Sequence, residues 1–140
     1  MSEPISAMGM TIQFLVESEA MSMFRFDLSA GGRVPAPHSH DAFEETIYCL
    51  DGVVTWTVDG IANELTEGDV LVIPRGAVHG FAGDPERDAS MLCIATPGVF
   101  GPSYFREVFA LFRGDGPPDM GAVLAVMRRH GLTPAVPAPH

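Results

Sequence analysis

The chain has 140 residues, a formal net charge of −10 at pH 7 and a hydrophobic content of 46%. This length predicts one domain with its own core, and the hydrophobic content excludes a disordered chain. The acidic charge argues against nucleic-acid binding and against attachment to an anionic membrane surface, and the absence of lysine excludes Schiff-base chemistry on a lysine of this chain.

Residues 1–20 are expected to form an N-terminal arm that contains one short strand. The first ten residues are small, polar and rich in methionine, whereas the apolar run at residues 11–16 favours a strand. Apolar and polar residues alternate over residues 21–28, which is the pattern of a strand with one buried face. Phe24 and Phe26 lie on the apolar face, so we expect them in the core or in a pocket wall.

Residues 21–97 are expected to form the core of a barrel. Asp-Gly pairs at positions 51–52 and 59–60 are typical of hairpin turns between neighbouring strands. The uninterrupted apolar run at residues 70–73 predicts a buried strand. Many short strands with regularly spaced turn signals indicate an all-β sandwich or barrel rather than an α/β fold. Further strands are expected at residues 45–50, 53–58, 61–65, 78–82 and 90–95.

The C-terminal part of the chain has a different pattern. Residues 98–132 carry apolar side chains at helical spacing, which predicts helices at residues 103–112 and 119–130. Ser103 is the expected N-cap of the first helix. These helices could cap one barrel mouth or dock on a partner subunit. Residues 133–140 are rich in proline and alanine and are expected to be disordered.

No apolar run reaches the length that a membrane-spanning helix needs, and the first thirty residues lack the pattern of a signal peptide. A cytoplasmic location is therefore expected. Cys49 and Cys93 both lie in apolar runs, which predicts buried thiols.

A cluster of histidines and carboxylates indicates a metal site. His38 and His40 are two residues apart, so on an extended strand both side chains point to one face. Glu44 and Glu45 are neighbours, so only one of them can join the same site. His79 adds a third imidazole if the fold brings it beside the first two. Imidazole and carboxylate together suit one divalent transition metal, Fe, Mn, Ni, Co, Cu or Zn, rather than calcium or magnesium.

These residues stand in two spaced motifs, and through them the chain resembles a single-domain cupin. The first cupin motif, G-x5-H-x-H-x(3,4)-E-x6-G, is matched by Gly32, His38, His40, Glu45 and Gly52. The second, G-x5-P-x-G-x2-H-x3-N, is matched by Gly68, Pro74, Gly76 and His79, while Gly83 replaces the final Asn. The resemblance implies a double-stranded β-helix, or jelly-roll barrel, here with a short C-terminal helical segment.

The resemblance also implies the ligand set and a function. It favours His38, His40, Glu45 and His79 as metal ligands, with Glu44 as the alternate for Glu45, because Glu45 has the motif spacing to the following glycine. The chain is similar to small quercetin-dioxygenase-like cupins, which implies a dioxygenase acting on a small, rather apolar substrate, with Glu45 as the catalytic base. The alternatives are a non-oxidative metal-dependent isomerase, lyase or decarboxylase, and a ligand-binding cupin without enzymatic activity.

The substrate and a second copy of the chain are the expected partners. Cupins often exchange an N-terminal strand across a dimer, so the resemblance implies a homodimer whose sheet edges are covered. Apolar and aromatic side chains near the two motifs are the candidate substrate-pocket residues: Phe24, Phe26, Tyr48, Trp56, Phe81, Met91 and Cys93.

Overall fold

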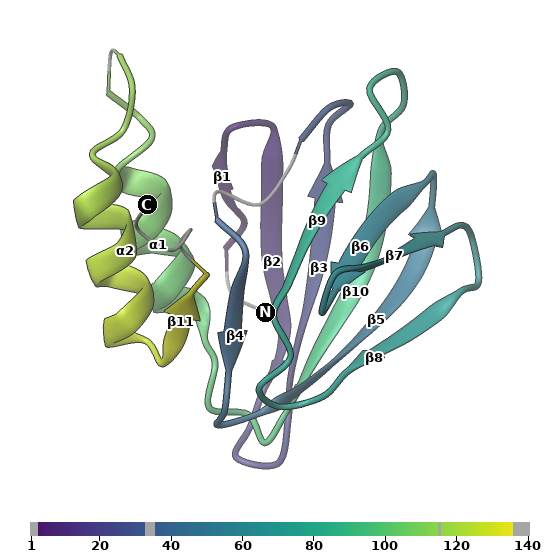
Figure 1. Ribbon diagram of the computed structural model, residues 1–140, viewed down its shortest axis with the longest axis horizontal. Coiled ribbons are helices and arrows are strands. Elements are labelled where there is room, and N and C mark those ends of the chain that lie inside the picture. The colour runs from purple at the N-terminus through teal and green to yellow at the C-terminus, as the bar shows by residue number, and fades with distance from the viewer. Residues whose placement is uncertain (1–2, 33–35, 115, 136–140) are drawn as a thin grey trace.

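The computed structural model describes residues 3–32, 36–114 and 116–135, which form two antiparallel sheets and two short helices (Figure 1). The six-stranded sheet has the order β1 (Ile5–Ala7), β2 (Met10–Glu17), β3 (Ser22–Leu28), β10 (Ala89–Thr96), β5 (Glu44–Asp51) and β8 (Val70–Ile73). The five-stranded sheet has the order β11 (Leu132–Pro134), β4 (His38–His40), β9 (His79–Gly83), β6 (Val54–Val58) and β7 (Ile61–Leu65). The prediction of an all-β barrel with a short helical segment is confirmed.

The core lies between the inner faces of the two sheets. In β10 the side chains of Met91, Cys93 and Ala95 are buried, whereas the alternate residues Leu92 and Ile94 are only half-buried. This is the period of two expected of strands with one face toward a core. Alternation therefore decides which side chains of each strand can reach the interior.

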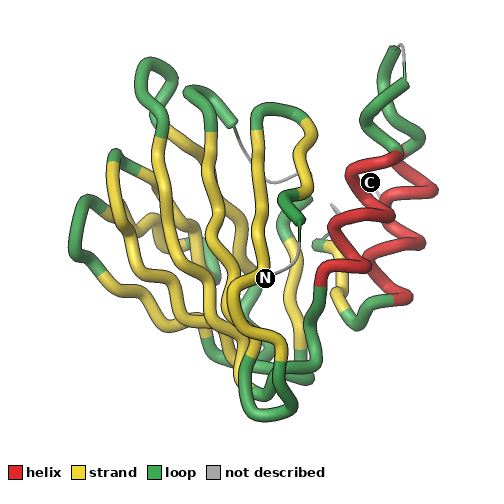
Figure 2. The backbone as a smooth tube through the Cα atoms, turned by 180° about the vertical axis from the view of Figure 1, so that it is seen from behind, coloured by secondary structure: helices red, strands yellow, loops and turns green. Residues whose placement is uncertain are grey.

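The two helices cover one side of the barrel, next to the edge strands β1 and β11 (Figures 1 and 2). Helix α1 (Pro102–Ala110) contacts β1 of the larger sheet, and α2 (Met120–Arg129) contacts β11 of the smaller sheet. Phe105 of α1 packs on Phe14 and Phe24, with ring centroids 6.0 and 5.3 Å apart. The sequence left two positions open for the helices, at one barrel mouth or against a partner subunit. The observed packing agrees with the first.

Three local expectations differ from the structure. Val70 and Val72 are 55% and 52% exposed, so β8 is not a buried strand but an edge strand with one solvent-facing side. Helix α1 has Gly101 rather than Ser103 as its N-cap, because Pro102 already fits the first helical position, where no amide hydrogen is needed. Thr133 was expected in a disordered tail but lies in β11; residues 136–140 lie outside the described part of the chain.

The N-terminal arm pairs within its own chain. Strand β1 lies antiparallel to β2, with Ile5 opposite Ile12, and Ile5 is buried. The homodimer stays a prediction. Within the described residues, neither helix is long and apolar enough to cross a membrane.

Candidate metal centre

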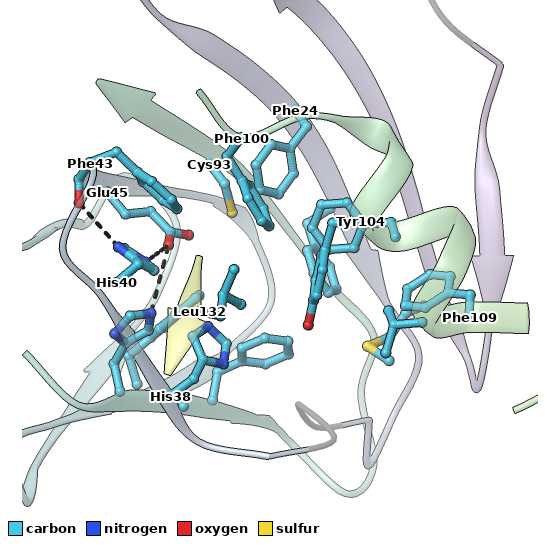
Figure 3. A pocket seen from close by; sticks show the side chains of 18 residues that line it. Phe24, His38, His40, Phe43, Glu45, Cys93, Phe100, Tyr104, Phe109 and Leu132 are labelled. Atoms are coloured by element: carbon cyan, nitrogen blue, oxygen red, sulfur yellow. Dashed lines mark hydrogen bonds and ion pairs between the residues drawn. The ribbon is translucent and has the colours of Figure 1, made fainter. Parts of the chain in front are cut away.

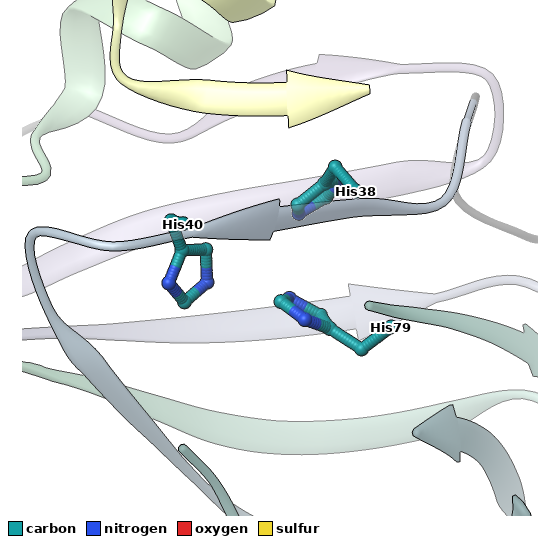
Figure 4. A group of neighbouring side chains, drawn as sticks. All are labelled: His38, His40 and His79. Carbon is teal, nitrogen blue, oxygen red and sulfur yellow. The ribbon is translucent and has the colours of Figure 1, made fainter. Parts of the chain in front are cut away.

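Three histidines from the two motifs meet inside the barrel. His38 and His40 project from β4 and His79 from β9, and one ligand nitrogen from each lies within 4.8 Å of the others (Figure 4). Strand geometry explains the arrangement, because residues two apart in β4 share a face and His38 lies directly opposite His79 in the β4–β9 pair. His40 and His79 are 2% exposed each.

The backbone fixes the orientation of each imidazole. The Nδ1 atoms of His38, His40 and His79 lie 3.0, 3.1 and 2.9 Å from the carbonyl oxygens of Ala36, Phe43 and Ala77. A carbonyl oxygen can only accept, so each Nδ1 is the protonated nitrogen and donates. A ring that is neutral in this orientation offers its Nε2 lone pair to a ligand. A backbone carbonyl on the second ring nitrogen is the usual support of a metal-binding histidine.

Glu45, and not Glu44, faces the three histidines. Glu45 is 8% exposed, and its Oε1 atom lies 3.1 Å from Nε2 of His40 and 3.7 Å from Nε2 of His79 (Figure 3). Glu44 is exposed on the opposite side of β5. The alternation of the strand thus places Glu45, and not its neighbour, beside the histidines; its role as a ligand stays a prediction.

The electrostatics of the cluster fit a bound cation. Burial and the neighbouring imidazole of His79 lower the pKa of His38 to about 4, so this ring is neutral at pH 7. Burial also lowers the pKa of His79, against the opposing charge of Glu45. Among the described residues the buried Nε2 atom of His79 has no hydrogen-bond partner, an arrangement that is costly unless a ligand fills it.

Glu45 remains ionised in this environment. Burial alone would raise the pKa of Glu45, but the interaction of its carboxylate with His40, and with the surrounding imidazoles when these are protonated, outweighs burial and lowers the pKa. A buried carboxylate that faces Nε2 lone pairs needs a proton or a cation between them. One carboxylate and three Nε2 atoms form the donor set that divalent transition metals favour.

A narrow aromatic cavity extends from the cluster toward helix α1 (Figure 3). Its free volume, counted as space open to the centre of a water molecule, is about 60 Å³. Nine of the residues predicted for the site do line this cavity: the four candidate ligands and Phe24, Phe26, Trp56, Phe81 and Cys93.

Two predicted pocket residues lie elsewhere. Tyr48 is 40% exposed, because it points from β5 to the outer face of the sheet. Met91 is fully buried in the core but does not line the cavity. Sequence reasoning missed a second set of lining residues, most of them from the C-terminal segment: Met10, Phe43, Gly80, Phe100, Tyr104, Phe105, Val108, Phe109 and Leu132. For the members of this set that lie in α1, helical spacing predicted a buried face but not which part of the molecule that face would cover.

A β-barrel that carries three histidines and one glutamate on its inner wall has the architecture of a metal-binding barrel. Comparison with known proteins shows which family the chain belongs to. Residues 24–95 match the cupin domain, so the chain belongs to the cupin family. Over 77 residues the chain is 35% identical to Quercetin 2,3-dioxygenase of Bacillus subtilis (strain 168), a match that covers 55% of this chain and 22% of the relative. The chain is also 41% identical over 69 residues to Germin-like protein 1-1 of Oryza sativa subsp. japonica, a match that covers 46% of this chain and 32% of the relative. The chain thus spans less than half of the length of these two relatives.

Solved structures show the same fold. KdgF from Halomonas sp. superposes with a TM-score of 0.63 at 18% identity, covering 69% of this chain and 86% of that chain. The polyketide cyclase RemF from Streptomyces resistomycificus gives a TM-score of 0.58 at 26% identity, covering 73% of this chain and 79% of that chain.

Proposed function

We propose that this cupin is a metal-dependent dioxygenase that acts on a small, planar, oxygen-bearing aromatic substrate. The observation that carries the proposal is the convergence of three Nε2 atoms and the Glu45 carboxylate on the wall of a cavity lined by aromatic side chains. Partial identity to a quercetin dioxygenase supports the same reaction class.

His38, His40, His79 and Glu45 would hold the metal, with the three Nε2 atoms and one carboxylate oxygen as donors. When bound, a redox-active metal supplies the one-electron chemistry that molecular oxygen needs to react with a closed-shell organic molecule. These four residues would leave positions on the metal open for substrate or oxygen. Open positions distinguish a catalytic metal site from a purely structural one.

Glu45 is suited to receive the proton of the substrate. Its carboxylate is ionised at neutral pH, faces the cluster and lies at the cavity wall, within reach of a hydroxyl group that approaches the histidines. A substrate that binds through an enol or phenol oxygen must lose this proton. Glu45 therefore serves as the base of the reaction as well as a ligand.

The cavity walls orient the substrate and exclude water. The Trp56 ring lies 6.2 Å from the His79 ring between centroids, and Trp56, Phe81 and Phe26 pack on one another at 4.9 Å for Trp56–Phe81 and 5.1 Å for Phe26–Phe81. Aromatic walls hold a flat ring system in one plane and remove solvent from the reacting groups. They offer no guanidinium group to bind the phosphate of a sugar phosphate, because the described lining has no arginine.

A second candidate is non-oxidative chemistry at the same site, with the metal acting as a Lewis acid. The 26% identity to a protein named polyketide cyclase favours this alternative, because such a reaction needs no oxidant. It uses the same ligands and the same aromatic cavity, so the two candidates differ in their requirement for oxygen.

Metal analysis and oxygen dependence test the proposal together. Purified tag-free protein, reconstituted with Fe(II), Mn, Co, Ni, Cu or Zn, is expected to hold about one equivalent of metal. The His38→Ala/His40→Ala variant should hold almost none, and His130→Ala, outside the cluster, should match the wild type. Conversion of flavonols should stop when oxygen is removed. Unchanged conversion without oxygen would instead support the Lewis-acid candidate, and no metal uptake would refute both.

A further inference from the structure

The cavity has a wall that the cupin domain itself does not supply. The matched cupin domain ends at residue 95, and the C-terminal segment at residues 98–132 lies beyond it. This segment nevertheless contributes a third of the cavity lining: Phe100, Tyr104, Phe105, Val108, Phe109 and Leu132. The substrate preference of this chain is therefore set in part by residues outside the shared domain.

Tyr104 is the polar residue of that wall. It is 5% exposed, and within the described part of the chain no group hydrogen-bonds its hydroxyl. Burial raises the pKa of Tyr104 far above its ordinary value, so the hydroxyl stays protonated and can donate. Figure 3 shows the side chain among the cavity residues, between α1 and the histidine cluster. A hydroxyl at the wall of a cavity, without a protein partner, can form a hydrogen bond with a molecule bound there.

A series of ring contacts connects Tyr104 with the histidine cluster. The rings of His40 and Phe43 are stacked with centroids 3.8 Å apart, those of Phe43 and Phe100 are stacked at 5.1 Å, and Phe100 lies 5.1 Å from Tyr104. The first two pairs are nearly parallel, with interplanar angles of 15° and 25°. These contacts form a continuous line of aromatic rings from the histidine cluster to Tyr104.

We propose that Tyr104 is a specificity-determining residue, whose hydroxyl binds an oxygen at the far end of a planar aromatic substrate that is bound at its other end by the histidine cluster. The proposal rests on the proposed function, because it takes the histidine end as the reactive end. It narrows the substrate class to flat polycyclic molecules with oxygen atoms at both ends.

Two flavones that differ by one hydroxyl group test this inference. 3-Hydroxyflavone and 3,4′-dihydroxyflavone share the group that approaches the cluster, and only the second has an oxygen at the far end. Binding to zinc-loaded protein is measured by quenching of Trp56, the single tryptophan of the chain, which lines the cavity. Zinc does not support oxidation, so binding is measured without turnover. The wild type is expected to bind the dihydroxy compound about fivefold more tightly.

The Tyr104→Phe variant should lose this preference and bind both compounds alike. Tyr48→Phe is the matched control, because Tyr48 is the other tyrosine of the chain and points away from the cavity; it should keep the preference. Equal binding of both compounds to the wild type, or a preference that survives in Tyr104→Phe, overturns the role of Tyr104 but leaves the proposed function intact. If neither compound binds to protein that holds zinc, the planar substrate class is wrong and this proposal falls with it.

Discussion

His38 and His79 lie directly opposite each other in the β4–β9 pair, with ring centroids 4.7 Å apart, although 40 residues separate them in the sequence. Strand β4 is only three residues long and is held on its other side by β11, where Leu132 pairs with His40. The position of two candidate ligands therefore depends on a strand near the C-terminus of the described chain.

Removal of β11 should weaken metal binding without removing a ligand. We expect a chain truncated after Gly131 to bind zinc about 10- to 100-fold more weakly, which is the usual effect of losing groups that support ligands. Competition with a chromophoric chelator measures this affinity. A chain truncated after Ala135 keeps β11 and serves as the control. Equal affinities of the two truncated chains would show that β11 does not support the site.

Replacement of Glu45 by Gln should remove both the fourth ligand and the base. We expect a fall in kcat of at least about 100-fold, the size of effect typical of a lost general base. Glu44→Gln is the matched control, because its side chain is exposed on the other face of β5; its kcat should stay within about twofold of the wild type. Steady-state kinetics under air measure both variants, and equal losses in the two would contradict the assignment of Glu45.

The metal-free protein should lose stability in acid. The pKa of His38 is lowered to about 4 in the folded state, so between its ordinary value of 6.5 and pH 4 the unfolded chain binds a proton that the folded chain does not. The free energy of unfolding therefore falls as pH falls through this window, by up to about 3 kcal/mol. Glu45 acts in the same direction at lower pH, because its folded pKa is also lowered.

Urea denaturation of chelator-treated protein at several pH values between 7 and 4 measures this loss. The His38→Gln variant cannot titrate at this position and should show a flatter dependence of unfolding free energy on pH. Parallel pH profiles for the variant and the wild type would mean that His38 is not the group responsible.

Gly52, which ends the first motif, is expected to be required for steric as well as conformational reasons. Its φ is +78°, and a Cβ there would collide with the backbone of Asp88 and lie 2.8 Å from Cα of Ala89. Gly60 has a similar φ of +81° but open space around it. We expect Gly60→Ala to cost about 1–2 kcal/mol and Gly52→Ala at least about 3 kcal/mol. Thermal and urea denaturation compare the two, and equal costs would exclude the steric contribution.

The sequence predicted the barrel and the residues of the histidine cluster because both depend on local rules. Alternation in the strands and the H-x-H spacing put His38 and His40 on one face, and motif spacing favoured Glu45, which the structure places inward. The outer face of an edge strand has no such signal, since the run at residues 70–73 is apolar throughout although Val70 and Val72 are exposed.

The contribution of α1 to the cavity could not be predicted, because it depends on docking rather than on periodicity. The spacing of Phe105 and Phe109 gave a helix with an apolar face, and the same pattern would suit a helix on any apolar surface. Only the packing of this helix beside β1 brings Tyr104 into the lining, while Tyr48, equally aromatic, lies on the outer face.

Phe105 connects helix α1 to the barrel, so truncating it should loosen the helix without affecting the metal ligands. It is 8% exposed and its ring packs on Phe14 and Phe24. Phe105→Ala is expected to lower the free energy of unfolding by about 3–5 kcal/mol, because the barrel can fill the resulting cavity only in part. Val72→Ala, at a position 52% exposed, should cost less than about 1 kcal/mol. Denaturant unfolding measures both, and metal analysis of the folded variants should give the wild-type equivalent. A loss of metal in Phe105→Ala would show that the helical segment and the histidine cluster depend on each other, since no side chain of the cluster would have been altered.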